Sequence, residues 1–187
     1  MTGLADQVVR LLETARPDGT LPIVRAGHPA LGAVATPYDG QFDDEVLTRL
    51  LAAMRATMLT APGVGLAAPQ VGLSVAIAVI EDEWPLEEQL AAERERTPVP
   101  FRVLINPGYA PLDDERVTHP EGCLSVPGWQ ADRARWRRVR LTGADETGAA
   151  LAEDLSGWPA RIVQHETDHL RGELYVLEAD LRTLSLT

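Results

Sequence analysis

The sequence predicts an α+β domain in which mixed or antiparallel sheets pack around a central helix that carries the pattern His-Glu-x-x-His. Apolar residues recur at helical spacing in some segments, whereas others are continuously apolar or are bounded by turn residues, as strands are. Helices and strands do not alternate strictly, which favours α+β over a parallel α/β fold. We expect residues 1–187 to form a single domain, because this length is sufficient for one core.

Two helices are expected in the first third of the chain. Apolar residues at positions 4, 8, 11, 12 and 15 predict an amphipathic helix over residues 3–16, within an N-terminal extension of residues 1–20. A second apolar stripe over residues 46–58 predicts another helix, which Asp43 or Asp44 would cap and Pro62 would end.

Strands and a charged insertion are expected in the middle of the chain. Residues 75–80 are continuously apolar, as a buried strand would be, and residues 101–105 form a second strand that a turn at 106–108 would close. Between them, residues 81–100 are highly charged and contain three prolines. We interpret them as a surface insertion with a short helix at 86–96, although a lid over a site is an alternative.

A hairpin and the last helix are expected near the C-terminal end. Residues 137–142 and 149–155 flank Asp-Glu-Thr-Gly, which is typical of a hairpin turn. The last helix is predicted to begin near Ser156, as its N-cap, and to end by Gly172.

Composition excludes several classes of function. The chain has 28 acidic and 17 basic residues, a net charge of -11, and its basic residues are all arginine. This balance disfavours nonspecific binding to DNA. The one cysteine excludes an internal disulfide and fits a reducing compartment. We see no signal peptide and no membrane-spanning segment, so we expect a cytoplasmic bacterial protein.

The pattern His-Glu-x-x-His at residues 165–169 predicts a metal site. On a helix His165 and His169 share one face, while Glu166 is rotated about 100° further round. Two imidazoles need a third protein ligand to leave one open position, and Cys123 offers the only thiolate. This set favours metal-assisted hydrolysis. The alternative is a helix whose histidines merely pack or cap.

Two other segments contain residues that could act in catalysis, but each has a purely structural explanation when taken alone. Cys123 lies in Glu-Gly-Cys-Leu-Ser at residues 121–125, where it could equally be a small buried hydrophobe. Residues 63–70 read Gly-Val-Gly-Leu-Ala-Ala-Pro-Gln. Their glycines allow a ligand to approach the backbone closely, and Gln70 could donate to an oxyanion, although a tight turn would explain the same residues.

Together these three segments resemble peptide deformylase. The family's motifs are Gly-x-Gly-Leu-Ala-Ala-x-Gln, Glu-Gly-Cys-Leu-Ser and Gln-His-Glu-x-Asp-His-Leu, and they stand complete at residues 63–70, 121–125 and 164–170. The resemblance runs from about residue 21 to residue 183. Residues 156–158 and 160–162, with the insertion, are similar to the subclass found in mitochondria and some bacteria.

The resemblance implies a metal-dependent amidohydrolase that removes the N-formyl group from the N-terminal methionine of nascent polypeptides and releases formate. Cys123, His165 and His169 would bind one divalent ion, with Fe²⁺ expected and Zn²⁺, Ni²⁺ or Co²⁺ able to replace it. Glu166 would take a proton from the attacking water and pass it to the leaving amine. The oxyanion would be stabilised by the metal and by two further groups, the Gln70 amide and the Leu124 backbone N–H.

The resemblance also implies how substrate binds. N-formylmethionyl peptides would lie as an added strand along Gly63, Val64 and Gly65. Four further residues would contact the peptide or its methionine, namely Glu121, Trp129, Trp158 and Ile162. His119 and Trp158 are larger or more polar than is common in the family, which predicts a narrowed pocket.

Further contacts follow less directly from the resemblance. Many bacterial relatives carry Arg where Gln130 stands. Glu121 and Arg135 are expected to form a salt bridge, the alternative being that both face solvent. A transient contact with the ribosome is expected, without the long C-terminal helix that some relatives use for docking.

Three alternatives stay open. A zincin-type protease also uses His-Glu-x-x-His, but its third ligand is normally a downstream Glu or His, and it would have no use for Cys123. A catalytically inactive relative could serve as a binding module or a structural metal domain, although such proteins usually lose Glu166, Gln70 or a ligand. A formylated small molecule could replace nascent chains as the substrate.

Overall fold

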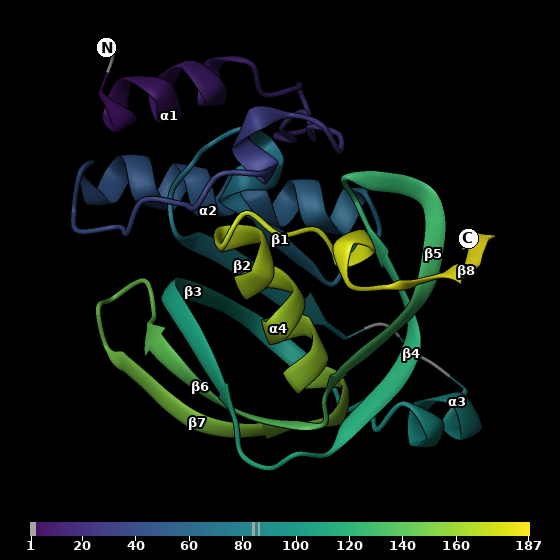
Figure 1. Ribbon diagram of the computed structural model, residues 1–187. Helices are drawn as coiled ribbons and strands as arrows, with labels where there is room; N and C mark the ends of the chain where they lie inside the picture. Colours follow the sequence, from purple (N-terminus) through teal and green to yellow (C-terminus); the bar gives the residue numbers. More distant parts are fainter. Residues whose placement is uncertain (1–2, 84, 86) are drawn as a thin grey trace.

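Two antiparallel sheets organise the computed structural model of this chain, which describes residues 3–83, 85 and 87–187 (Figure 1). The larger sheet has five strands in the order β1-β2-β3-β6-β7. These strands are Gly65–Ala67 (β1), Ile77–Asp82 (β2), Val99–Pro111 (β3), Arg138–Ala144 (β6) and Ala150–Ser156 (β7). The smaller sheet has three strands in the order β4-β5-β8, formed by Arg116–Cys123, Val126–Trp136 and Asp180–Leu186.

Helices cover or separate these sheets. The α-helices are Leu4–Glu13 (α1), Asp44–Thr60 (α2), Glu88–Glu93 (α3) and Gly157–Leu170 (α4). Short 3-10 helices occupy Pro29–Leu31 (η1), Ala68–Val71 (η2) and Tyr175–Leu177 (η3). The predicted first, second and last helices are thereby confirmed within a few residues, as is the hairpin that joins β6 and β7.

The core has two parts, one on each face of the large sheet. In the first, α2 packs on β2 and α1 packs on α2, and buried side chains such as Val8, Leu50 and Met54 join one cluster. In the second, Ile162 and Val163 of α4 pack on residues that include Ala78, Leu104 and Leu141. Helix α4 also contacts β5 of the small sheet, so this helix lies between the two sheets (Figure 1).

The expected turn at residues 106–108 is wrong. Strand β3 continues through these residues, and its pairing shifts register between Ile105 and Gly108. Asn106 takes a positive φ of 49°, a conformation that asparagine tolerates better than most residues. Its side chain exchanges two hydrogen bonds of 2.7 Å with the backbone of Tyr38. The turn residues therefore mark a bulge within a long strand rather than a strand end.

The charged segment 81–100 is only partly a surface insertion. Glu81 and Asp82 are buried members of β2, and Val99 begins β3. The short helix, α3, covers fewer residues than the predicted 86–96. Residue 86, the first of the predicted helix, lies outside the described residues. Asp82 accepts hydrogen bonds from Arg96 and, at 2.7 Å, from the indole of Trp158, so the segment is tied back to the start of α4.

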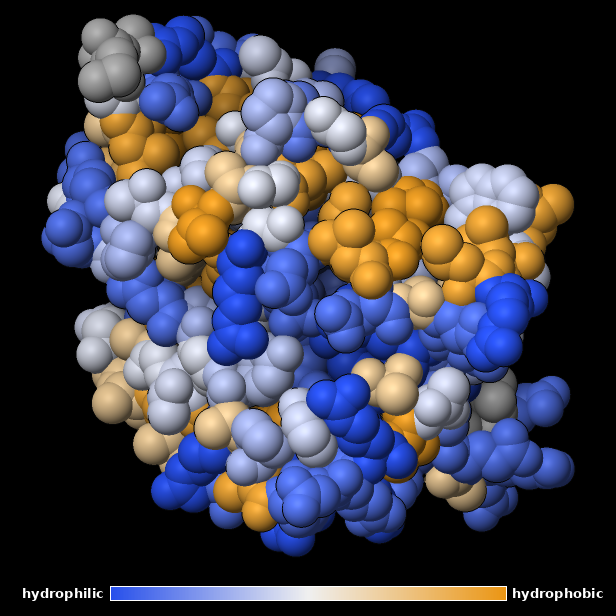
Figure 2. Space-filling model, viewed as in Figure 1, coloured by the Kyte–Doolittle hydropathy of each residue, from blue (hydrophilic) through white to orange (hydrophobic). Residues whose placement is uncertain are grey.

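Strand β8 was not expected from the sequence. Its residues are mostly exposed, and it pairs with β5 at the edge of the small sheet. Figure 2 shows hydrophobic side chains gathered over η3 and β8, where Leu177, Leu181, Leu184 and Leu186 are exposed. Within the described residues, no helix has the length and apolar character that crossing a membrane requires.

Two N-cap positions make a matched pair for measuring stability. The Asp43 carboxylate accepts a hydrogen bond of 2.8 Å from the Val46 N–H, whereas Ser156, at the equivalent position of α4, makes no side-chain cap bond. We therefore predict that Asp43→Ala lowers the free energy of unfolding by about 1 kcal/mol. Ser156→Ala should change it by less than about 0.5 kcal/mol. Urea denaturation measures both, and equal losses would contradict the assignment.

Candidate active site

Helix α4 brings the two histidines of the motif together. The His165 and His169 Nε2 atoms are 3.1 Å apart, and their rings meet edge to face. His169 is almost completely buried, while His165 is half-buried at the edge of a cavity. The i and i+4 spacing therefore places two imidazole nitrogens at one point, as the sequence predicted.

Cys123 completes this cluster from the small sheet. It is the last residue of β4, where the pairing with β5 shifts register after Gly122. Its Sγ lies 3.3 Å from His169 Nε2, and the three ligand atoms of Cys123, His165 and His169 all lie within 4.8 Å of one another. One thiolate and two imidazoles are a donor set that suits several first-row divalent metals, so these residues fit a resident ion.

Two N–H donors lie close to the cysteine sulfur. The Ser125 backbone N–H lies 3.4 Å from Cys123 Sγ, and the Gln70 side-chain amide lies 3.5 Å from it. The other end of that amide is fixed, because Gln70 Oε1 accepts a hydrogen bond of 2.8 Å from the Ala67 N–H. The Gln70 NH₂ group is thereby aimed at the cluster.

A buried carboxylate sets the orientation of His165. Glu121 Oε1 lies 2.7 Å from His165 Nδ1, and the same carboxylate accepts hydrogen bonds from Arg135 and Arg161. Burial alone would raise the pKa of Glu121, but hydrogen bonds from His165 and Arg135 hold that pKa well below its usual value. A proton on Nδ1 leaves the Nε2 lone pair directed at Cys123 and His169. The predicted Glu121–Arg135 salt bridge is confirmed.

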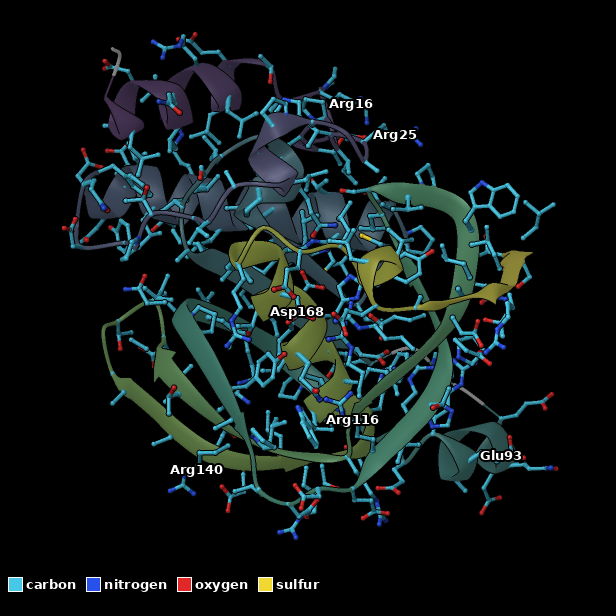
Figure 3. All side chains as sticks on the ribbon, in the orientation of Figure 1. Arg16, Arg25, Glu93, Arg116, Arg140 and Asp168 are labelled. Carbon is cyan, nitrogen blue, oxygen red and sulfur yellow. The ribbon has the colours of Figure 1, made fainter. Side chains whose placement is uncertain are left out.

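The sequence reading missed a second buried carboxylate, Asp168. It accepts hydrogen bonds from Tyr109 at 2.9 Å, from Arg133 at 2.9 Å and from Arg135 at 2.5 Å. Asp168 lies on α4 (Figure 3), and both arginines lie on β5. Arg133 and Arg135 are two residues apart and so share one face of the strand, which was the only signal that the sequence offered.

Glu166 is buried beside the cluster without a charged partner. One of its oxygens, Oε2, has no hydrogen-bond partner among the described residues. Burial raises the pKa of Glu166 to about 7. Gly65 of β1 lies directly against it, since a Cβ atom at Gly65 would stand 2.2 Å from Glu166 Oε1. The carboxylate is therefore held in a close-fitting, largely dry position, suited to a group that exchanges a proton.

A cavity of about 800 Å³ leads to this cluster. All the site residues predicted from the sequence line it except His169, which lies behind the others. The lining includes Gly63, Val64, Gly65, Gln70, Glu121, Cys123, Leu124, Trp129, Trp158, Ile162, His165 and Glu166. Gln130 also lines the cavity. Three segments that are far apart in the sequence thus form one concave site.

His119 does not belong to this site. It lines a separate small hollow with Arg137, Gly157 and others, so the expectation that it narrows the methionine pocket is wrong. On β4 it lies two residues before Glu121, so it shares that residue's face of the strand, and it is half-buried there. Trp158 does line the cavity, and the hydrogen bond from its indole to Asp82 fixes its ring.

Comparisons with known proteins agree on one family. The sequence model of the Polypeptide deformylase family matches residues 20–183. A Streptomyces avermitilis protein named "Peptide deformylase 3" is 58% identical over 182 residues, covering 97% of this chain and 80% of that protein. A Streptomyces coelicolor protein named "Peptide deformylase 1" is 54% identical, covering 97% of this chain and 82% of that protein.

A solved structure of a peptide deformylase also matches this chain. The class I type b peptide deformylase from Acinetobacter baumannii, with Met-Ala-Ser bound, has a TM-score of 0.75 and 32% identity. The match covers 85% of this chain and 98% of that chain.

The expectation of a mitochondrial-type chain needs correction. The human mitochondrial peptide deformylase is 37% identical over 172 residues, well below the two Streptomyces proteins. The bacterial relatives are therefore the more similar ones. By its sequence and its fold, the chain belongs to the polypeptide deformylase family, whose members are metal-dependent hydrolases that remove the N-formyl group from nascent polypeptides.

Proposed function

We propose that Cys123, His165 and His169 hold one divalent ion, that α4 is the metal-binding helix around which the sheets pack, and that deformylation takes place in the adjoining cavity. The observation that carries this proposal is the meeting of one thiolate and two imidazoles within 4.8 Å, beside the buried Glu166. The chain is an enzyme that removes N-formyl groups. The proposal assigns that reaction to these particular residues.

Fe²⁺ is the ion we propose for the cell, with Zn²⁺, Ni²⁺ or Co²⁺ able to replace it, because a Cys/His₂ set accepts several such metals. When bound, the ion polarises the formyl carbonyl and lowers the pKa of water. The hydrogen bond between His165 and Glu121 supports this role, since it leaves Nε2 as the ligand atom.

Glu166 is the proposed proton carrier. Its buried carboxylate takes a proton from the attacking water and passes it to the amine that leaves. The environment suits both steps, because burial raises the pKa of this group to about 7. The close contact with Gly65 holds the carboxylate in one position.

Two donors are proposed to stabilise the oxyanion. The Gln70 amide is fixed by the Ala67 N–H and faces the cluster. The Leu124 backbone N–H donates to no acceptor within the described part of the chain, and Leu124 lines the cavity. Each donor is aimed before substrate arrives, so little reorganisation is needed at the moment of reaction.

The formyl-peptide is proposed to bind as an added strand along Gly63, Val64 and Gly65. Strand β1 lies at the edge of the large sheet, which leaves one side available for pairing. Glu121, Trp129, Trp158 and Ile162 would contact the peptide or its methionine side chain, since all of them line the cavity. Residues 1–187 would act as one catalytic domain in the bacterial cytoplasm on nascent chains, with a transient contact at the ribosome.

The central test is formate release from formyl-Met-Ala-Ser by protein purified without oxygen. We expect one Fe²⁺ or Ni²⁺ per chain, and loss of turnover when a chelator removes it. Glu166→Ala should lower kcat by about 10²–10⁴-fold while the metal content is retained, because the base is lost but the ligands remain.

The control for that test is Cys123→Ala, which should lose both metal and activity. Elemental analysis of the same samples separates the two effects. A fully metal-loaded parent protein that releases no formate would contradict the proposal and indicate a different formylated substrate or a binding role.

The contact between Gly65 and Glu166 gives a second prediction. Gly65→Ala places a methyl group where Glu166 Oε1 now lies, so the carboxylate must move and kcat should fall by at least about tenfold. Gly32→Ala is the matched control, because its Cβ atom would meet open space. Steady-state kinetics on formyl-Met-Ala-Ser measures both, and a Gly65→Ala enzyme with the parent's kcat would refute the positioning role.

Trp158 gives a third prediction, which concerns the enzyme's preference for the side chain of the first residue of the formyl-peptide. Because its ring lines the cavity and is held by Asp82, we expect formyl-Phe peptides to react more slowly than formyl-Met peptides. Trp158→Leu should narrow that difference, since a smaller side chain enlarges the pocket. The ratio of kcat/KM values for the two peptides is the measurement. Equal rates in the parent enzyme would exclude a narrowed pocket.

A further inference from the structure

Three arginines that line the active-site cavity form no ion pair within the described residues. One of them, Arg16, lies near enough to Asp18 that its charge helps to lower the pKa of that carboxyl. Most arginines of this chain form ion pairs with carboxylates. Among the ion pairs found within the described residues, none includes Arg16, Arg25 or Arg94, and all three line the cavity. Within the described residues Arg10, Arg49 and Arg116 form no ion pair either, but they do not line the cavity.

Arg25 is anchored to the catalytic residues themselves. The N–H of Val24 donates to the Gln70 carbonyl at 2.9 Å, and the N–H of Ala26 donates to the Ser125 carbonyl at 2.8 Å. Both residues also lie against the cysteine sulfur, through the Gln70 side-chain amide and the Ser125 backbone N–H. The backbone on either side of Arg25 is therefore fixed by the site, while its side chain is exposed at the cavity.

Arg16 stands on the same N-terminal segment as Arg25, and Figure 3 shows the two labelled close together there. A turn fixes its position, because the Arg16 N–H donates to the Thr20 carbonyl at 2.9 Å. Thr20 and Leu21, which follow this turn, also line the cavity. Arg16 and Arg25 thus place two positive charges along one wall.

Arg94 reaches the cavity from the end of α3. Its guanidinium carbon lies 5.6 Å from the centre of the Trp158 ring, within the range of a cation–π contact. This contact holds the side chain near the pocket without neutralising its charge. The charged segment 81–100 thereby contributes a cation to the site, although most of its own charges are negative.

The acidic side chains of the cavity do not cancel these charges. They are Glu121 and Glu166, and both lie at the inner end beside the metal ligands. Glu121 is already bonded to Arg135, Arg161 and His165. The outer part of the cavity is therefore positive, in contrast to the net charge of -11 for the whole chain.

We propose that Arg16, Arg25 and Arg94 form an anion-binding rim that selects formyl-methionyl peptides with Asp or Glu among the residues that follow the methionine. This inference rests on the proposed function, because it places the formyl group at the metal cluster. The residues after methionine then extend outward past the rim, and arginine is well suited to pair with their carboxylates.

A peptide fits this rim better than a nucleic acid does. The three arginines line the same cavity as the catalytic cluster, where a peptide bound at that cluster would extend past them. The strong negative charge of the whole chain would also repel a phosphate backbone.

The test compares C-terminally amidated tetrapeptides of the series formyl-Met-Ala-Ala-Ala in which Asp or Asn replaces each alanine in turn. Amidation leaves the side chain as the only anion, and Asn matches Asp in shape. At one or more positions we expect kcat/KM for the Asp peptide to exceed that for the Asn peptide by about two- to tenfold, as one or two partly exposed pairs would give. The ratio should fall toward one in about 1 M salt, where the Debye length is roughly 3 Å.

Variants identify the residues responsible. Arg16→Gln, Arg25→Gln and Arg94→Gln are made singly and together. At least one single variant should lower the Asp/Asn ratio, and the triple variant should bring it close to one. The matched control is Arg49→Gln, which removes the same charge from an exposed residue of α2 that does not line the cavity. It should leave the ratio unchanged.

The outcomes are distinguishable. A ratio of one in the parent enzyme, with the Asn peptides turned over normally, overturns the rim while leaving deformylation intact. A ratio above one that survives in the triple variant overturns it as well, because the preference then arises elsewhere. Failure to release formate from any peptide of the series would instead count against the proposed function.

Discussion

The buried ionic network between β5 and α4 is the interaction on which the rest of the site depends. Glu121 and Asp168 are joined through Arg135, with Arg133, Arg161 and Tyr109 completing their hydrogen bonds. Burying so many charges is costly unless each is paired, and removing one partner would typically cost about 3–5 kcal/mol. This network fixes α4 against the small sheet, and so fixes both histidines relative to Cys123.

The fixed positions of Cys123, His165 and His169 are what the proposed hydrolysis requires. Glu121 orients His165, and the register shift after Gly122 turns Cys123 toward the same point. The packing of α4 between two sheets removes water from Glu166, which is why its pKa rises. Gly65 is required next to it, because any side chain there would occupy the space of the carboxylate. Ligands, base and substrate edge are thus parts of one rigid arrangement.

Two peripheral segments also shape the cavity. The N-terminal segment is bonded to Gln70 and Ser125 through Val24 and Ala26, so it forms a wall rather than a loose extension. The charged segment between β2 and β3 is bonded to Trp158 through Asp82. Both lie outside the three family motifs, and both bring unpaired arginines to the cavity. Selectivity among substrates can therefore vary through these segments without changing the residues that bind metal.

The sequence by itself determined the family and the first, second and last helices, and it singled out the residues that we propose as metal ligands and base. These depend on short-range spacing and on motifs that stand complete. It also predicted the pairing of Glu121 with Arg135. Tertiary structure alone decided that Asp168 joins this network and that His119 lines a hollow other than the cavity. It also decided that β3 runs through its turn-like residues and that β8 pairs at the edge of the small sheet. These outcomes depend on which distant segments come into contact, and a local sequence pattern does not specify such long-range contacts.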